Sequence, residues 1–100
     1  MTPRLVLEPE AEDDLENARA WYEQRVAGLG GEFVGAVRET LETIERAPMQ
    51  FRVERADVRK AVLRHFPYII RFVVLDDVIS VIAVFHVRRD PAIWHRRADV

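Results

Sequence analysis

The stretch from Arg59 to Pro91 constrains the fold more than any other part of the chain, because β-branched and aromatic residues are densest there. Residues of these types favour paired strands. Two such runs, residues 68–75 and 78–88, flank Asp76 and Asp77. Aspartate tolerates the left-handed conformation that a tight turn between two strands requires. The sequence therefore predicts a β-hairpin closed by these two aspartates.

The alternation of side chains along strands predicts one apolar and one mixed face for this hairpin. The pairs expected on the apolar face are Phe72 with Val81, Ile70 with Ala83, and Tyr68 with Phe85. The other face is expected to carry Arg71 opposite Ile82, Val73 opposite Ser80, and His86 and Arg88 near its far end. We therefore expect one face to join the core and the other to present cationic groups on an apolar floor.

Two amphipathic helices precede the hairpin. Apolar residues recur at spacings of three and four along residues 11–26 and 33–44, which is typical of helices with one buried face. Glycines 28, 30 and 31 indicate a turn between the helices and not a phosphate-binding loop, because no Lys-Ser or Lys-Thr pair follows them. Further strands are expected at Arg4–Glu8 and Val58–His65. Residues 48–57 are expected to form a loop that can include a short strand, and residues 92–97 a helical turn.

These elements predict an α+β fold in β-α-α-β-β-β order, as a single domain of residues 1–100. A helical hairpin is expected to pack on one face of a mainly antiparallel sheet. The register of the strand at 58–65 stays open, because a slip of one residue reverses its faces. Either Arg59 or the set with Lys60 and Arg64 could therefore lie beside His86.

Composition excludes several classes of protein. With 49% hydrophobic and 32% charged residues the chain is globular and not disordered. Its apolar runs are far shorter than the roughly 20 residues that span a bilayer, and residues 1–8 lack the pattern of a signal peptide. We therefore expect no membrane contact and a cytoplasmic location. The absence of cysteine excludes disulfides and thiolate catalysis.

The charges divide between the two halves of the chain. Residues 1–50 hold 11 acidic and 5 basic residues, a net of −6, and residues 51–100 hold 6 acidic and 10 basic residues, a net of +4. Of the 15 basic residues only Lys60 is not arginine. Arginine binds carboxylate or phosphate through two parallel hydrogen bonds, so the sheet half is suited to anionic partners. Codon composition is an equally good explanation for the excess of arginine.

Neither a metal nor a cofactor is expected. The acidic residues at 10, 12, 13 and 14 fall in the first turn of a helix, where they complement the helix dipole, and a metal site is the less favoured explanation. The histidines at 65, 86 and 95 lack the close spacing of zinc ligands.

The candidate site is the face and rim of the sheet that carry Arg71, His86, Arg88 and Arg89, with Arg59 or Arg64 arriving from the neighbouring strand. Clustered arginine could stabilise charge on a phosphate while histidine acts as acid or base, as RNA cleavage requires. The alternative is an ordinary solvated sheet face, which is the commoner case. Trp94 could stack on a base, although packing against the sheet is favoured over stacking.

An ordered set of segments resembles a known family. It comprises P-E-A-E-D-D-L at 9–15, W-Y at 21–22, A-P at 47–48, V-R-K-A-V-L-R-H-F-P-Y-I-I-R-F at 58–72 and H-V-R-R-D-P-A-I-W-H-R-R at 86–97. Over nearly its whole length the chain resembles the RelE/ParE superfamily of bacterial type II toxins, also called plasmid stabilisation proteins. The β-α-α-β-β-β order derived above is also the order of that family's fold.

The resemblance implies a toxin that a small cognate antitoxin neutralises by wrapping it. It also implies joint control of transcription, with operator DNA bound only through the antitoxin. RelE-like members cut messenger RNA on the ribosome, whereas ParE-like members inhibit DNA gyrase without cleaving RNA. The amino-acid sequences of the segments at 66–72 and 86–91 are more similar to those of ParE-like members.

By position, Arg59 matches the basic residue before the family's central strands, and His86, Arg88 and Arg89 match the basic group after the last strand. The chain lacks a tyrosine after Arg88 and has only one of the lysines that RelE-like enzymes use. The leading hypothesis is therefore a non-enzymatic gyrase inhibitor that arrests growth. The first alternative is a ribosome-dependent endoribonuclease with those four residues as catalytic candidates, and the second is an inactive, antitoxin-binding co-repressor. The residues expected to bind the target or RNA are Arg59, Arg64, Arg71, His86, Arg88, Arg89 and Trp94.

Overall fold

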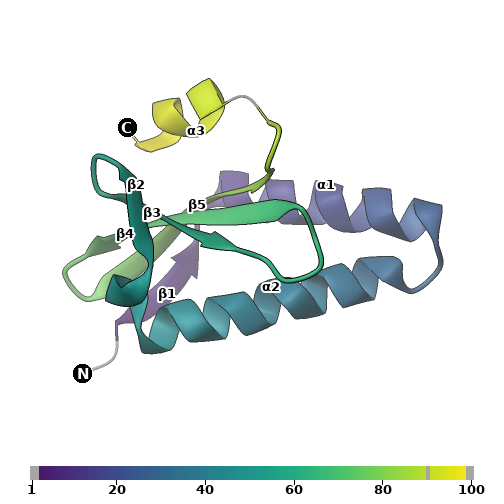
Figure 1. Ribbon diagram of the computed structural model, residues 1–100, viewed down its shortest axis with the longest axis horizontal. Helices are drawn as coiled ribbons and strands as arrows, with labels where there is room; N and C mark the ends of the chain where they lie inside the picture. The colour runs from purple at the N-terminus through teal and green to yellow at the C-terminus, as the bar shows by residue number, and fades with distance from the viewer. Residues whose placement is uncertain (1–2, 90, 99–100) are drawn as a thin grey trace.

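One five-stranded sheet separates two long helices from a short third helix (Figure 1). The computed structural model describes residues 3–89 and 91–98. In chain order the elements are β1 (Arg4–Leu7), α1 (Pro9–Arg25), α2 (Leu29–Arg46), the 3-10 turn η1 (Pro48–Gln50), β2 (Arg52–Arg55), β3 (Val58–Val62), β4 (Tyr68–Leu75), β5 (Val78–His86) and α3 (Pro91–Ala98). The strands lie in the order β1-β5-β4-β3-β2, with β1 parallel to β5 and the other pairs antiparallel.

The architecture expected from the sequence is confirmed, with a helical hairpin packed on a mainly antiparallel sheet. The short strand allowed within residues 48–57 is β2, which pairs with β3 at the edge of the sheet. The strand expected to reach residue 65 ends at Val62, because His65 adopts a left-handed φ of 67° and turns the chain. The helical turn expected at 92–97 is the full helix α3. No helix among the described residues is long and apolar enough to cross a membrane.

The hairpin of β4 and β5 closes at Asp76 and Asp77 as predicted, and Asp76 has the expected left-handed φ of 52°. The pairs Phe72–Val81 and Val73–Ser80 also form as predicted. Beyond them the predicted register is wrong by one residue. Ile70 pairs with Val84, Arg71 with Ala83, and Tyr68 with His86.

The physical cause of the shift is a β-bulge in β5. Phe72 pairs with Val81 and Arg71 with Ala83, so Ile82 has no partner of its own on β4. Because one extra residue reverses the alternation, Ala83 and Phe85 share a cluster with Ile82 on the α3 side, whereas Val81 and Val84 lie in the core beneath α1 and α2. The uniform alternation assumed from the sequence therefore fails after Val81.

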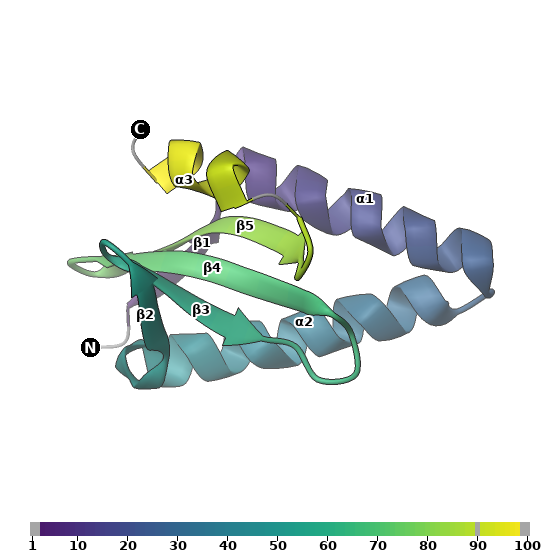
Figure 2. The same cartoon turned by 45° about the horizontal axis from the view of Figure 1, so that its top comes forward.

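The main core lies between the sheet and the α1–α2 hairpin, and aromatic rings fill one end of it. Tyr22 and Phe33 from the helices pack against Phe66 and Tyr68, with ring centroids 5.0–6.0 Å apart. Phe66 belongs to the loop between β3 and β4, which Figure 2 shows reaching toward α2. Aromatic contacts of this kind stabilise a fold beyond the area that they bury. They hold the β3–β4 loop against the helices.

The turn between α1 and α2 depends on glycine and on one carboxylate. Gly28 has a φ of 90°, a left-handed conformation that residues with a side chain rarely adopt. The two carboxylate oxygens of Glu23 accept hydrogen bonds from the backbone N–H groups of Gly28 and Gly30, each at 2.9 Å. These hydrogen bonds hold the pKa of Glu23 below its usual value. Glu23 therefore caps the start of α2.

The opposite face of the sheet was expected to be open and cationic, and this expectation is wrong for half of it. Trp94 of α3 is 1% exposed and packs with Val58, Ile82, Ala83 and Phe85. The helix covers this half because an apolar patch there would otherwise face water.

The outer edge of β5 is completed by a buried ion pair. β1 pairs with β5 only as far as Val81, so the backbone groups that follow need other partners. The carboxylate of Asp14 accepts a hydrogen bond from the N–H of Val84 at 3.0 Å and binds Arg97 Nη1 at 2.6 Å. Arg97 Nη1 also donates to the carbonyl of Ile82 at 2.9 Å. Asp14 and Arg97 thereby join α1, the bulge and α3.

We expect Asp14→Ala to lower the free energy of unfolding by about 3–5 kcal/mol, because it leaves Arg97 and the Val84 N–H without their buried partner. Urea unfolding followed by circular dichroism measures this loss. The control is Asp13→Ala, whose exposed carboxylate has no hydrogen-bond or ion-pair partner among the described residues. It should change the free energy of unfolding by less than about 0.5 kcal/mol. Equal effects of the two substitutions would contradict the role assigned to Asp14.

Glu23 should make stability depend on pH in the acidic range. Because its pKa is lower in the folded chain, its contribution is complete above the unfolded pKa of about 4.3 and is lost as the pH falls through the folded pKa. We expect Glu23→Gln to lower the melting temperature at pH 7 and to weaken its dependence on pH below about pH 4.5. Glu42→Gln on the exposed side of α2 should retain the wild-type dependence. An unchanged acid profile in Glu23→Gln would show that this cap does not stabilise the fold.

Candidate functional site

Two loops bring cationic residues to one end of the sheet. Arg64 and His65 lie in the β3–β4 loop, and Arg88 and Arg89 follow β5. The loops are joined by a hydrogen bond of 2.9 Å from the N–H of Val87 to the carbonyl of Pro67. The side chains of all four residues are exposed. We call the end of the sheet that carries Arg64, Arg88, Arg89 and the half-buried His86 the cationic end.

His86 lies at the base of the cationic end and is oriented by two contacts. Its Nδ1 accepts a hydrogen bond from the backbone N–H of Arg88 at 3.1 Å, which leaves the proton of a neutral ring on Nε2. Its ring meets Tyr68 edge to face, with centroids 5.4 Å apart. Because of the bulge in β5, His86 lies on the side of the helical hairpin. The sequence predicts it on the opposite face, together with Arg71.

A groove of about 510 Å³ lies beside His86, between α1 and the ends of β4 and β5. Trp21 and Tyr22 line one wall, and Tyr68, His86 and Arg89 line the other. Trp21 is 49% exposed, although an indole of this size is usually covered. The guanidinium of Arg25 lies 4.1 Å from its ring centroid, which adds a further cation at this end.

A second groove, of about 770 Å³, lies on the other side of the β3–β4 loop. It is lined by α2 and by the loop itself, including Arg64 and Phe66, and it shares Tyr22 and Pro67 with the first groove. Burial raises the pKa of both Tyr22 and Tyr68, so both hydroxyls are neutral at physiological pH. Two grooves flank the β3–β4 loop next to exposed arginines, and the second is lined by both apolar and charged residues.

Hydrogen bonds to the segment before β2 hold the guanidinium of Arg59 away from the cationic end. Its Nη1 donates to the carbonyl of Phe51 at 2.7 Å, and this fixes the segment before β2. Arg59 pairs with Phe72 on β4, whereas His86 pairs with Tyr68. Four residues of strand separate the two rows by roughly 13 Å, so Arg59 and His86 do not meet at one reacting atom.

Arg71 and Trp94 are the two most buried members of the predicted set. Arg71 is 7% exposed, and its Nε donates to Glu54 at 2.8 Å. This hydrogen bond also lowers the pKa of Glu54. The guanidinium of Arg71 lies 4.6 Å from the ring centroid of Trp94. Both side chains contact the sheet and α3, and neither presents enough surface to stack on a base or grip a phosphate.

The structure divides the predicted site residues into two groups. Of the seven residues predicted to bind the target or RNA, His86, Arg88 and Arg89 lie together at the end of β5, and Arg64 lies at the same end of the sheet on the other side of the β3–β4 loop. Arg59, Arg71 and Trp94 are separated from them. Within residues 3–89 and 91–98, no three His, Cys, Asp or Glu side chains are grouped so that they could hold a metal ion.

Sequence reasoning missed Trp21 at the groove and Asp14 and Arg97 at the strand edge. Trp21 borders the apolar stripe of its helix, and this position indicates a side chain that is partly buried. Asp14 was grouped with the acidic first turn, but it is 6% exposed while its neighbour Asp13 is exposed. Its helical position, three residues after Ala11, places it on the same face as that buried alanine. The spacing of three residues from Ala11 could therefore have indicated that Asp14 is buried.

Comparison with known proteins identifies the family of the chain. Residues 5–91 match the model of the ParE toxin of the type II toxin–antitoxin system, parDE. Among solved structures, a chain of the chromosomal ParDE system from P. aeruginosa is similar, with a TM-score of 0.74, 19% sequence identity, and coverage of 85% of this chain and 96% of that chain. At this identity the likeness shows the fold alone. A search among curated proteins finds no match.

We expect Arg71→Ala to lower the free energy of unfolding by about 2–3 kcal/mol, because it removes a largely buried, charge-assisted hydrogen bond and a cation–π contact. Arg64→Ala, at an exposed position, should change it by less than about 0.5 kcal/mol. Chemical unfolding of both variants measures the difference. A stability loss confined to Arg64→Ala would reverse the structural roles given to these two arginines.

Proposed function

Because this chain belongs to the ParE toxin family of type II toxin–antitoxin systems, we propose that it arrests growth by inhibiting DNA gyrase and that a cognate antitoxin neutralises it. The observation that carries the proposal is the family match over residues 5–91. Gyrase acts on the chromosome, so the site of action is the bacterial cytoplasm. Operator DNA is bound only through the antitoxin, which supplies the DNA-binding part of the complex.

The cationic end is the proposed docking surface for gyrase. Arginine and tryptophan are enriched at the centres of protein interfaces. Here Arg89 lines the same groove as the half-exposed Trp21, and its chain neighbour Arg88 is exposed. The adjoining groove of about 510 Å³ offers an apolar anchor point next to these charges. An inhibitor that acts by docking needs such a surface and needs no catalytic residue.

The alternative function is ribosome-dependent cleavage of messenger RNA. It has the support of one observation, the position of the half-buried His86 next to the exposed Arg88 and Arg89. Two features weigh against it. Arg59 is hydrogen-bonded to a backbone carbonyl, and Arg71 is paired with Glu54, so neither is free to stabilise a transition state at His86. An inactive co-repressor that only binds the antitoxin is the third possibility.

The test of the proposed function is pulse labelling of DNA and protein synthesis after induction of this gene without its antitoxin. We expect DNA synthesis to fall first, and we expect the purified protein to inhibit supercoiling by gyrase in vitro. The double substitution Arg88→Ala/Arg89→Ala should weaken supercoiling inhibition by tenfold or more, since it removes about 2 kcal/mol or more of interface contacts. Co-expression of the antitoxin should restore growth.

The matched control is Arg38→Ala/Arg52→Ala, which removes the same charge from exposed positions on α2 and β2. It should inhibit supercoiling like the wild type. An early fall in protein synthesis, with messenger RNA cuts that Arg88→Ala/Arg89→Ala or His86→Ala abolishes, would favour the endoribonuclease instead. No growth arrest at all would favour the inactive co-repressor.

A further inference from the structure

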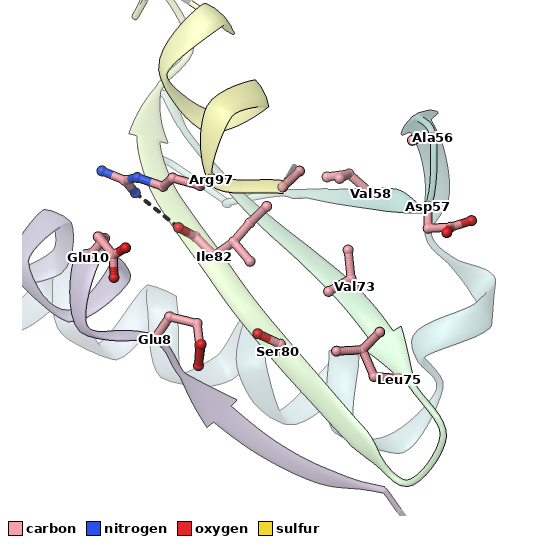
Figure 3. Close-up of a pocket in the computed structure, with 11 residues that line it drawn as sticks. Glu8, Glu10, Ala56, Asp57, Val58, Val73, Leu75, Ser80, Ile82 and Arg97 are labelled. Atoms are coloured by element: carbon pink, nitrogen blue, oxygen red, sulfur yellow. Dashed lines mark hydrogen bonds between the residues drawn. The ribbon is translucent and has the colours of Figure 1, made fainter. Parts of the chain in front are cut away.

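A groove of about 370 Å³ lies on the α3 side of the sheet, away from the cationic end (Figure 3). Its walls come from the β1–α1 junction, the β2–β3 turn and the end of α3, and its floor comes from β4 and β5. A volume of this size accommodates one or two side chains of a partner. None of the contacts assigned above to gyrase involves it.

The floor of the groove is apolar and only partly covered. Val73 and Ile82 extend the cluster that packs under α3, and Leu75 beyond them is 57% exposed. α3 ends at Ala98, which forms one margin of the groove, so the covered half of this sheet face leads directly into an open half. The open half leaves apolar surface in contact with water, which a bound apolar group would remove.

The floor of the groove also carries one hydroxyl group, that of Ser80. Ser80 is 8% exposed, and its hydroxyl makes no hydrogen bond with any residue that the structure describes. Figure 3 shows Ser80 on the floor of the groove between Glu8 and Leu75. Because Ser80 lines the groove, its hydroxyl is accessible to a group that enters there and can donate or accept a hydrogen bond.

The rim of the groove is acidic. Glu8 and Glu10 lie on one side and Asp57 on the other, and none of these carboxylates has an ion-pair or hydrogen-bond partner within residues 3–89 and 91–98. Among the described residues that line the groove, Arg97 is the one cation, and its guanidinium is bound to Asp14 and to the carbonyl of Ile82. The helix dipole of α1 accounts for Glu10 but not for Asp57 on the opposite wall.

We propose that this groove binds a basic segment of a partner protein through an arginine or lysine side chain next to an apolar residue. The alkyl part of the basic side chain lies on Val73 and Ile82, and its charged group pairs with the carboxylates of the rim. Ser80 accepts a further hydrogen bond from that group or from the segment's backbone. The unpaired carboxylates repel phosphate, so nucleic acid and acidic peptides are excluded from this groove.

The test uses the full chain and an acetylated, amidated pentapeptide of alternating leucine and arginine. Binding is measured by fluorescence anisotropy and located by NMR chemical shifts. We expect the shifts to centre on the backbone amides of Val73, Leu75 and Ser80. The triple substitution Glu8→Gln/Glu10→Gln/Asp57→Asn should weaken binding about tenfold, as expected for the loss of three exposed ion pairs.

The matched control is Glu39→Gln/Glu42→Gln/Glu45→Gln, which removes the same charge from the exposed side of α2 and should leave the affinity unchanged. Ser80→Val, which fills the floor with an apolar group, should abolish the NMR shifts while the far-ultraviolet circular dichroism stays native. Equal binding of a pentapeptide with glutamate in place of arginine would overturn the proposal, as would shifts located elsewhere. Self-association that the rim substitutions abolish would assign the groove to a second copy of the chain and would also overturn it. The outcome does not depend on whether gyrase is the target.

Discussion

The buried contact of Asp14 with Arg97 is the constraint on which the arrangement of the other elements depends. β1 is too short to cover the whole outer edge of β5, so the Val84 N–H and the Ile82 carbonyl would face a gap. A carboxylate from α1 and a guanidinium from α3 meet these two groups and neutralise each other at 2.6 Å. Buried ion pairs contribute little net energy by themselves, but each partner is costly to leave alone. The pair therefore specifies where α1 and α3 sit more than it adds to stability.

The bulge at Ile82 is the second constraint, and it decides which residues can act together. Without it, the alternation of β5 would place His86 on the same face as Arg71, where a cationic site was expected. With it, His86 faces the helical hairpin beside Tyr68, and Arg71 remains on the α3 side, paired with Glu54. A single inserted residue thus divides the predicted site between the cationic end of the sheet and an ion pair under α3.

The parts of the fold that local patterns determine could be predicted from the sequence. The Asp76–Asp77 turn, the two amphipathic helices and the order of elements all follow from signals within a few residues. The parts that were missed depend on contacts between distant segments. The bulge is stabilised by residues 14 and 97, which lie far from it in the chain, and no local pattern around Ile82 reports them. The same holds for the site. The exposure of Arg88 could be predicted from the sequence, but the burial of Arg71 could not, because it depends on the packing of α3 against the sheet.

The charge of the chain is divided in space in a way that its net value of −2 conceals. Exposed arginines lie at the end of the sheet, where Arg89 also approaches Asp14 at 4.0 Å. Carboxylates without an ion-pair partner among the described residues surround the groove floored by Ser80 on the α3 side. Fields of opposite sign at separate surfaces orient different partners and suppress the exchange of one for the other. A partner that contributes a basic segment to the groove does not compete with one that meets the cationic end. The proposed docking surface and the proposed groove lie on separate parts of the sheet, so binding at one need not block the other.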